Sequence, residues 1–301
     1  MTGPSTGHGA FSMNNLTRTM VFTAFTALTA LAQAPANRPP QGQGQQPRRP
    51  RVDMTTMVRP IEMHDSVWIE DLTVLEIRDL LKAGKTTALI PVGGMEDNGP
   101  YITVSQHNSI MRALAEPVAR QLGNALCAPV VTMAPATPER ASSPGSVSLT
   151  AETYKSILTD MATSLRAQGF KNIMIMVDHG SDQPPAIEVT KALNEKWKNE
   201  GATVGYVSDF YDYNAVEKYS TDVLGNHEKT DGYHDDYYVA AISAVVDPVS
   251  ARMPERIKAG KTTINGIDLA APKAIEDGKK IIDMRVTAAV KQIRSLTGET
   301  K

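Results

Sequence analysis

The sequence of 301 residues contains a single cysteine, Cys127. One thiol excludes an intramolecular disulfide and a cysteine-rich zinc site. Because Cys127 lies in a strand-like segment with no base beside it, we predict an inert core thiol and not a nucleophile.

The sequence also has no large excess of charge of one sign, since 31 Lys and Arg residues balance 33 Asp and Glu residues and leave a formal net charge of −2. This balance gives no electrostatic reason to expect nucleic acid or an anionic membrane as a partner.

The apolar run near the N-terminus, residues 20–31, is too short to cross a bilayer as a mature helix. Arg18 precedes this run, and an A-x-A pattern follows it at residues 32–34. A basic residue, a short apolar run and an A-x-A site are typical of a secretory signal peptide. We therefore predict a signal peptide over residues 1–34 and a periplasmic or secreted protein that is free of the membrane after cleavage. An uncleaved membrane anchor is the alternative.

The segment after the predicted cleavage site is of low complexity. Residues 35–51 are rich in Pro, Gln, Gly and Arg and have almost no apolar side chains. Such a segment cannot offset the entropy of ordering, so we predict a disordered linker over residues 35–60. The apolar fraction of 41% is ordinary for a globular chain, and we predict a single domain over residues 61–301.

Strand-like and helix-like segments alternate through this domain. The continuous apolar runs at 87–92 and 172–177 are typical of strands that are buried on both faces, and 125–133 and 203–208 are further predicted strands. The predicted helices are 74–82, 108–122, 150–168, 185–200, 235–246 and 278–295. The alternation predicts an α/β fold, a three-layer α/β/α sandwich with a mainly parallel sheet.

Polar side chains follow the two fully buried strands. Glu96 comes after the first strand through a glycine turn, and His107 lies further along the same loop. Asp178 and His179 directly follow the second strand. Because ligands bind at the carboxyl ends of parallel strands, we expect Glu96 and His179 to meet in one crevice. One carboxylate and two imidazoles are a ligand set that a divalent metal with an open position uses for hydrolysis.

Four ordered blocks of the sequence resemble the creatininase family, the creatinine amidohydrolases and their relatives. The family's strand and Gly-Ser-x-Glu-Gln-His-Gly-Pro-His block is similar to residues 94–101, and its Pro-Gly-Thr-Ile-Ser block to residues 144–148. Its Asn-Gly-His-Gly-Gly-Asn block is similar to residues 177–182. Its His-Ala-Gly-x-x-Glu-Thr-Ser helix start is similar to the segment from His234, with Pro248 at the expected spacing. The resemblance covers about Asp71 to Ile293 and implies a creatininase-like fold and amidohydrolase chemistry.

The family is known for a two-metal site. The resemblance places Glu96 and His179 on ligand positions and His107 on the position of a bridging Asp. It places Asn98 on a ligand His, and Ser181 where some members have an acidic ligand. A neutral imidazole offers one nitrogen to one ion. The resemblance therefore implies one divalent metal, zinc first and manganese or iron as alternatives, held by Glu96, His107 and His179. Its bound water, with a pKa lowered to about 7, would supply hydroxide.

Further residues receive roles from the same resemblance. His234 is the candidate acid or base that protonates the leaving nitrogen, and Asp236 is a candidate to assist it. Asp236 is alternatively a charge that favours a helix N-terminus, with no part in the chemistry. The remaining candidates, which orient the ligands or line the substrate pocket, are Asn98, Tyr101, Asp178, Ser181, Asp182 and Tyr233.

These observations predict a metal-dependent hydrolase of a non-peptide C–N bond in a small molecule, an amide that is possibly cyclic. A lactone or ester hydrolase is an alternative, because hydroxide attacks either acyl group. A non-catalytic binding protein that keeps the fold is the third hypothesis. The resemblance also implies a homo-oligomer, with small molecules and no nucleic acid as partners.

The signal peptide generates the first testable prediction. We expect the exported protein to begin near Pro35, because cleavage follows the A-x-A site. Mass spectrometry of the protein recovered outside the cytoplasm measures its N-terminus. Recovery of residue 1 or residue 13 at the N-terminus would contradict cleavage.

Overall fold

The computed structural model describes residues 52–299, so the predicted signal peptide, 1–34, and most of the predicted linker lie outside the described residues. Residues 52–60 form no helix or strand. They contact the first helix through the Arg78 guanidinium, whose Nη1 donates to the Met57 carbonyl at 2.8 Å. Within the described part, no helix is long and apolar enough to cross a membrane.

A parallel sheet forms the centre of the domain. Its strands are β1 (Thr87–Val92), β2 (Ala125–Cys127), β3 (Asn172–Val177) and β4 (Thr203–Tyr206), in the spatial order β2-β1-β3-β4. Every pairing between neighbours is parallel, and β1 pairs with β3 along its whole length. The prediction of a mainly parallel sheet is confirmed. The carboxyl ends of β1 and β3 therefore lie side by side.

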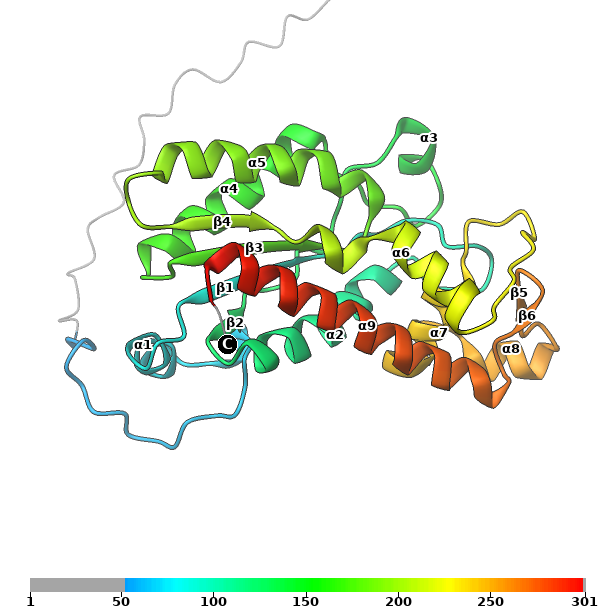
Figure 1. Ribbon diagram of the computed structural model, residues 1–301, viewed down its shortest axis with the longest axis horizontal. Helices are drawn as coiled ribbons and strands as arrows, with labels where there is room; N and C mark the ends of the chain where they lie inside the picture. Colours follow the sequence, from blue (N-terminus) through cyan, green and yellow to red (C-terminus); the bar gives the residue numbers. More distant parts are fainter. Residues whose placement is uncertain (1–51, 300–301) are drawn as a thin grey trace, which may run out of the picture. The chain divides into compact units, whose positions relative to one another are not determined.

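Helices cover both faces of the sheet (Figure 1). The long helices are α1 (Val74–Lys82), α2 (Gln106–Leu122), α4 (Ala151–Ala167), α5 (Gln183–Trp197), α7 (Tyr237–Val246) and α9 (Pro272–Thr297). Helices α4 and α5 lie on one face of the sheet, and α2, α7 and α9 lie on the other. This arrangement is the predicted three-layer sandwich.

The side chains of the central strands alternate between two cores. Leu89 and Met174 pack with α2, α7 and α9, whereas Ile90 and Ile175 pack with α4 and α5. Successive side chains of a strand point to opposite faces, so a strand that is buried on both faces must be apolar throughout. This is why the two continuous apolar runs mark the centre of the sheet.

Several element boundaries differ from the predictions. The strand predicted over 125–133 ends at Cys127, because Pro129 lacks the N–H that a ladder requires. Helix α9 begins at Pro272, before the predicted start at Gly278. Gly278 lies inside the helix, where a Cβ would lie 2.4 Å from the Ala241 carbonyl oxygen of α7. The glycine therefore allows close packing of the two helices and does not mark the start of α9.

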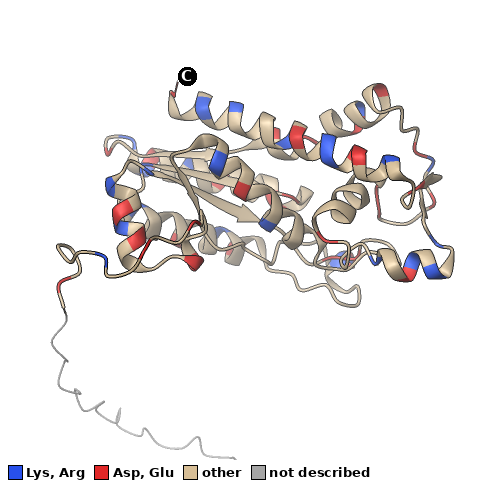
Figure 2. Ribbon diagram, turned by 90° about the horizontal axis from the view of Figure 1, so that it is seen from below, with Lys and Arg blue, Asp and Glu red and all other residues tan. Residues whose placement is uncertain are grey.

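Shorter elements join these parts. They are η1 (Ile69–Asp71), α3 (Pro138–Ala141), η2 (Gly180–Asp182), η3 (Ser208–Tyr211), α6 (Tyr213–Lys218), η4 (Tyr219–Val223), α8 (Met253–Ala259), β5 (Thr263–Ile264) and β6 (Ile267–Asp268). Basic and acidic residues are interspersed along the helices, as Figure 2 shows. The balanced charge of the sequence is therefore also mixed along the folded chain.

Candidate metal centre

Three elements bring the predicted ligands together at one edge of the sheet. Glu96 follows β1, His179 follows β3, and His107 lies in the first turn of α2. The Nε2 atom of His179 lies 2.7 Å from Glu96 Oε2, and the Nε2 atom of His107 lies 3.1 Å from Glu96 Oε1. All three side chains are buried. The expected meeting of Glu96 and His179 is therefore found, and His107 joins them.

A close backbone approach sets the position of His107. The amide oxygen of Asn108, at the start of α2, accepts a hydrogen bond from the Gly94 N–H at 3.0 Å. A Cβ at Gly93 would lie 2.2 Å from the same oxygen, so only glycine fits there. The glycine turn after β1 thus lets the start of α2 lie against the strand end and carries His107 to Glu96.

The second nitrogen of each imidazole has a fixed hydrogen-bond partner. His107 Nδ1 lies 2.8 Å from Asp178 Oδ2, and a carboxylate can only accept, so Nδ1 carries the proton. Ser181 donates its hydroxyl proton to the Pro135 carbonyl oxygen at 2.5 Å. Its oxygen must therefore accept from His179 Nδ1, which lies 2.8 Å away. Both imidazoles consequently present Nε2 to Glu96, which is the arrangement that orients histidine ligands in metal sites.

The buried Asp178 carboxylate is itself held on its other side. Arg285 of α9 donates to Asp178 Oδ1 at 2.5 Å, and its Nε–H donates to the Phe210 carbonyl oxygen at 2.9 Å. Burial alone would raise the pKa of Asp178, but Arg285 and His107 outweigh it and lower that pKa. The carboxylate is therefore charged at neutral pH and fixes His107 Nδ1–H. Sequence reasoning missed Arg285.

Mutual contacts shift the pKa values of the three candidate ligands. Burial alone would raise the pKa of Glu96, but hydrogen bonds from His107 and His179 hold it well below its usual range. Burial alone would lower the histidine values. Asp178 and Glu96 nevertheless raise the pKa of His107 to about 9, and Asp182 and Glu96 raise that of His179 to about 10. Without a metal, both imidazoles are cations that neutralise the surrounding carboxylates.

The three side chains are of the kinds that bind a divalent metal, but in this structure they hydrogen-bond to one another. Over residues 52–299, no group of three or more His, Cys, Asp or Glu side chains is arranged so that it could hold a metal ion. Ligand atoms about 2.1 Å from one zinc ion would lie about 3.0–3.4 Å apart, and the contacts of 2.7 and 3.1 Å to Glu96 are close to that range. A metal ion that replaced the two Nε2 protons would accept the lone pairs of both Nε2 atoms and of the Glu96 carboxylate. The donor atoms therefore suit a divalent ion in kind, although their present arrangement does not form a metal site.

Arg140, another residue that sequence reasoning missed, lies at the rim of this cluster. It belongs to the short helix α3 and carries no recognisable motif. Its Nη1 donates to Glu96 Oε2 at 2.9 Å and also lies 2.9 Å from both ring nitrogens of His234. His234 Nδ1 lies 2.7 Å from the Asp97 carbonyl oxygen and must donate to it, so His234 Nε2 accepts from Arg140. Arg140 thus connects the predicted ligand Glu96 with the predicted acid or base.

The other predicted residues lie at different distances from the cluster. Asn98 is buried and donates to the Glu96 carbonyl oxygen at 3.1 Å. The buried carboxylate of Asp182 lies 3.4 Å from His179 Nδ1, and burial raises its pKa to about 6. Asp236 contacts the Tyr213 hydroxyl at 3.4 Å.

The two predicted tyrosines have no hydrogen bond to the candidate ligands. The Arg256 guanidinium lies over the Tyr101 ring, with its Cζ atom 4.9 Å from the ring centroid. The Tyr233 side chain is exposed. Neither residue fills the position of a metal ligand in this arrangement.

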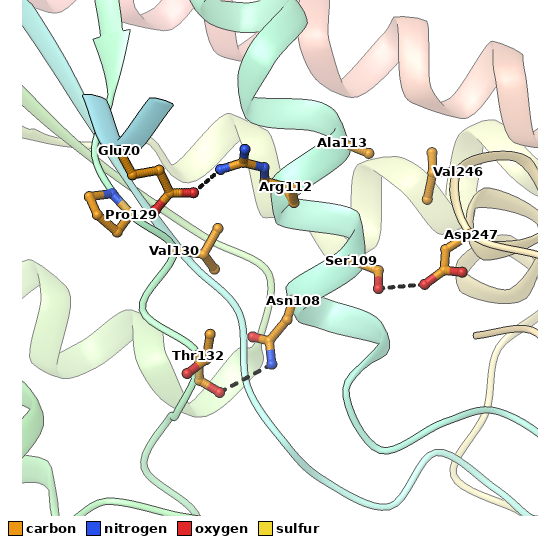
Figure 3. Close-up of a pocket in the computed structure, with 10 residues that line it drawn as sticks. All are labelled: Glu70, Asn108, Ser109, Arg112, Ala113, Pro129, Val130, Thr132, Val246 and Asp247. Atoms are coloured by element: carbon orange, nitrogen blue, oxygen red, sulfur yellow. Dashed lines mark hydrogen bonds and ion pairs between the residues drawn. The ribbon is translucent and has the colours of Figure 1, made fainter. Parts of the chain in front are cut away.

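Cavities in the described part of the chain lie outside the cluster, and two of them bear on the candidate site. A cavity of about 540 Å³, drawn in Figure 3, lies between the start of α2 and the loop after β2, and none of its lining residues is a candidate ligand. A second cavity, of about 370 Å³, lies beside the His234 loop and is lined by Tyr233, Asp235 and Asp236. The candidate ligands therefore lie outside both of these cavities.

Comparison with known proteins places the chain in a family. The family model described as "Creatininase: Creatinine amidohydrolase" matches residues 70–292, and the chain belongs to this family. No curated protein sequence gives a significant match.

Solved creatininase structures share the fold. A creatinine amidohydrolase (creatininase) superposes with a TM-score of 0.61 at 18% identity, covering 79% of this chain and 100% of that one. A manganese form of creatininase has a TM-score of 0.60 at 19% identity, and a variant of the Zn-Zn type has 0.59 at 18%. Each of these two covers 77% of this chain and 98% of its own. At these identities, the likeness shows the fold alone.

The raised histidine pKa values generate a prediction about stability. A group with a raised pKa in the folded state stabilises the fold below its unfolded pKa, and this contribution is lost as the pH rises through the folded value. We therefore expect the free energy of unfolding of the metal-free protein to fall between pH 6.5 and about 10. Urea denaturation of chelator-treated protein over this range measures the fall.

A variant that cannot titrate is the control for this experiment. His107→Gln combined with His179→Gln removes both imidazoles, so its stability should depend less on pH over the same range. If the wild-type curve is flat or rises, or if both proteins show the same slope, the assigned contacts are wrong.

Proposed function

We propose that this protein is a metal-dependent hydrolase of a non-peptide C–N bond in a small molecule, an amide that is possibly cyclic. The observation that carries the proposal is the convergence of Glu96, His107 and His179. Asp178 and Ser181 hold both imidazoles so that Nε2 faces Glu96. Membership of the creatininase family supports the same class of reaction.

We propose one divalent ion per chain, zinc first and manganese as an alternative, held by Glu96, His107 and His179. The solved manganese and zinc forms of creatininase support this choice of metals. Such an ion supplies Lewis acidity, which polarises a carbonyl and makes water a nucleophile at neutral pH. The chain's own contribution is to fix the tautomers of His107 and His179 through their Nδ1 atoms.

His234 is the proposed acid and base. Its Nδ1–H bond to the Asp97 carbonyl oxygen leaves Nε2 to take a proton from water and to pass it to the leaving nitrogen. In the free protein this nitrogen accepts from Arg140, so substrate binding must replace that contact. Burial raises the pKa of Asp236, and the nearby His234 offsets part of that rise. We propose that Asp236 assists His234 as a nearby acidic side chain.

The metal assignment is tested on the ligands. Elemental analysis after loading with zinc or manganese should return about one ion per chain, because three protein donors converge on one position. His179→Ala should lose both the metal and the activity. Asn226→Ala, which removes another buried polar side chain, is the control and should keep the metal. A wild-type protein that holds no ion after loading would favour a non-catalytic binding protein. Two ions per chain would contradict the single site.

The role of His234 is tested separately from metal binding. His234→Ala should keep the metal and lose rate, on the order of 10²–10⁴-fold for a positioned proton donor. The loss should be smaller for substrates whose leaving group needs no proton, such as activated esters and lactones. Hydrolysis of matched amides, esters and lactones measures both effects and also separates an amidase from a lactonase. His227, which lines the cavity beside the His234 loop, is the alternative histidine for this role. If His234→Ala keeps full turnover while His227→Ala abolishes it, the assignment to His234 is wrong.

A further inference from the structure

Arg140 lies between the two parts of the proposed chemistry. Its Nη1 donates to Glu96 Oε2 and also contacts His234 Nε2, each at 2.9 Å. These two contacts use both hydrogens of Nη1. The side chain is 41% exposed, so the guanidinium faces solvent as well as the cluster. A ligand that contacts both Glu96 and His234 would therefore lie beside Arg140.

One edge of this guanidinium is free. Among residues 52–299, Arg140 Nε and Nη2 have no hydrogen-bond partner. They carry three N–H donors in one plane, arranged as a fork. Such a fork matches the two oxygens of a carboxylate, and bidentate pairs of this kind are stronger and more specific than neutral hydrogen bonds.

The charges around the site favour the same ligand. Asp178 is neutralised by Arg285, with which it forms a buried ion pair. One divalent ion would be balanced by Glu96 and by the buried Asp182, whose carboxylate lies 3.4 Å from His179 Nδ1, and Arg140 adds a further positive charge beside Glu96. Opposite charge attracts and orients a ligand most strongly where water is excluded. The loaded site is therefore suited to a negatively charged substrate.

Other acidic residues near His234 line a separate cavity. They are Asp235 and Asp236, together with Glu217 and Glu228. Neither Arg140 nor Glu96 lines that cavity. The acidic cavity and the free edge of Arg140 are therefore separate features.

We propose that the substrate carries a carboxylate beside its scissile amide and that Arg140 binds this carboxylate through Nε and Nη2. The proposal rests on the proposed function and names the substrate class of that site. Arg140 is thus a residue that determines specificity.

Calorimetric binding of matched probes to the metal-loaded protein tests this proposal. The probes are N-acetylglycine against N-acetylglycinamide, and 5-oxoproline against 5-oxoprolinamide, which differ only in the carboxylate. We expect the carboxylate of each pair to bind at least about tenfold more tightly to the wild type. Arg140→Lys should lose most of this preference, because an ammonium cannot form the fork, and Arg140→Ala should lose all of it.

Arg120→Ala is the matched control. The Arg120 side chain is also 41% exposed and also pairs with a glutamate, Glu116, but it lies near the far end of α2 from His107. This variant should keep the wild-type preference. Metal content and circular dichroism of each variant show that the site and the fold are intact, and Arg140→Gln replaces Arg140→Ala if the latter does not fold.

The outcomes separate the proposal from the proposed function. Equal affinities within each pair, or no binding of any probe at millimolar concentration, would overturn the carboxylate assignment. A preference that persists in Arg140→Ala would show that the metal or another group binds the carboxylate, which also overturns it. A preference that depends on Arg140 in a protein that hydrolyses none of the amides would support the binding site and reject the hydrolase.

Discussion

The hydrogen bond between Asp178 and His107 is the interaction on which the rest of the site depends. It joins the residue directly after β3 to the first turn of α2, and the same carboxylate accepts from Arg285 of α9. All three side chains are buried, and removal of one partner from a buried ion pair costs about 3–5 kcal/mol. Three elements that form the fold are therefore tied together by the group that directs the His107 Nε2 atom toward Glu96.

The sequence was sufficient to predict the part of the site that follows from the sheet. Two continuous apolar runs had to be central strands, and neighbouring parallel strands end at the same edge. The contact between Glu96 and His179 follows from that rule, because each lies just past such an end. His107 was predicted in the loop and lies one residue inside α2, where the Asn108 contact with Gly94 fixes it.

The two arginines could not be predicted in the same way. Arg285 occupies one position of an amphipathic helix, where a charged residue normally faces solvent, and its partner Asp178 is 107 residues away. Arg140 lies in a four-residue helix with no periodic pattern. Its contacts with Glu96 and His234 arise from the tertiary path of a loop, which neither hydrophobic periodicity nor local spacing records. Charge partners that only the tertiary structure brings together therefore could not be predicted from the sequence.

These arginines also explain how the cluster tolerates residues that depart from the family's pattern. If His107 takes the position of the family's bridging carboxylate, as the resemblance implies, the centre has one negative charge fewer. Arg285 neutralises Asp178, and Arg140 pairs with Glu96, which lowers the negative charge that is available to cations still further. This charge supports the proposal of one ion, because Glu96 and two neutral imidazoles suffice to hold one. The Nε and Nη2 atoms of Arg140, which have no hydrogen-bond partner among the described residues, remain available to a ligand.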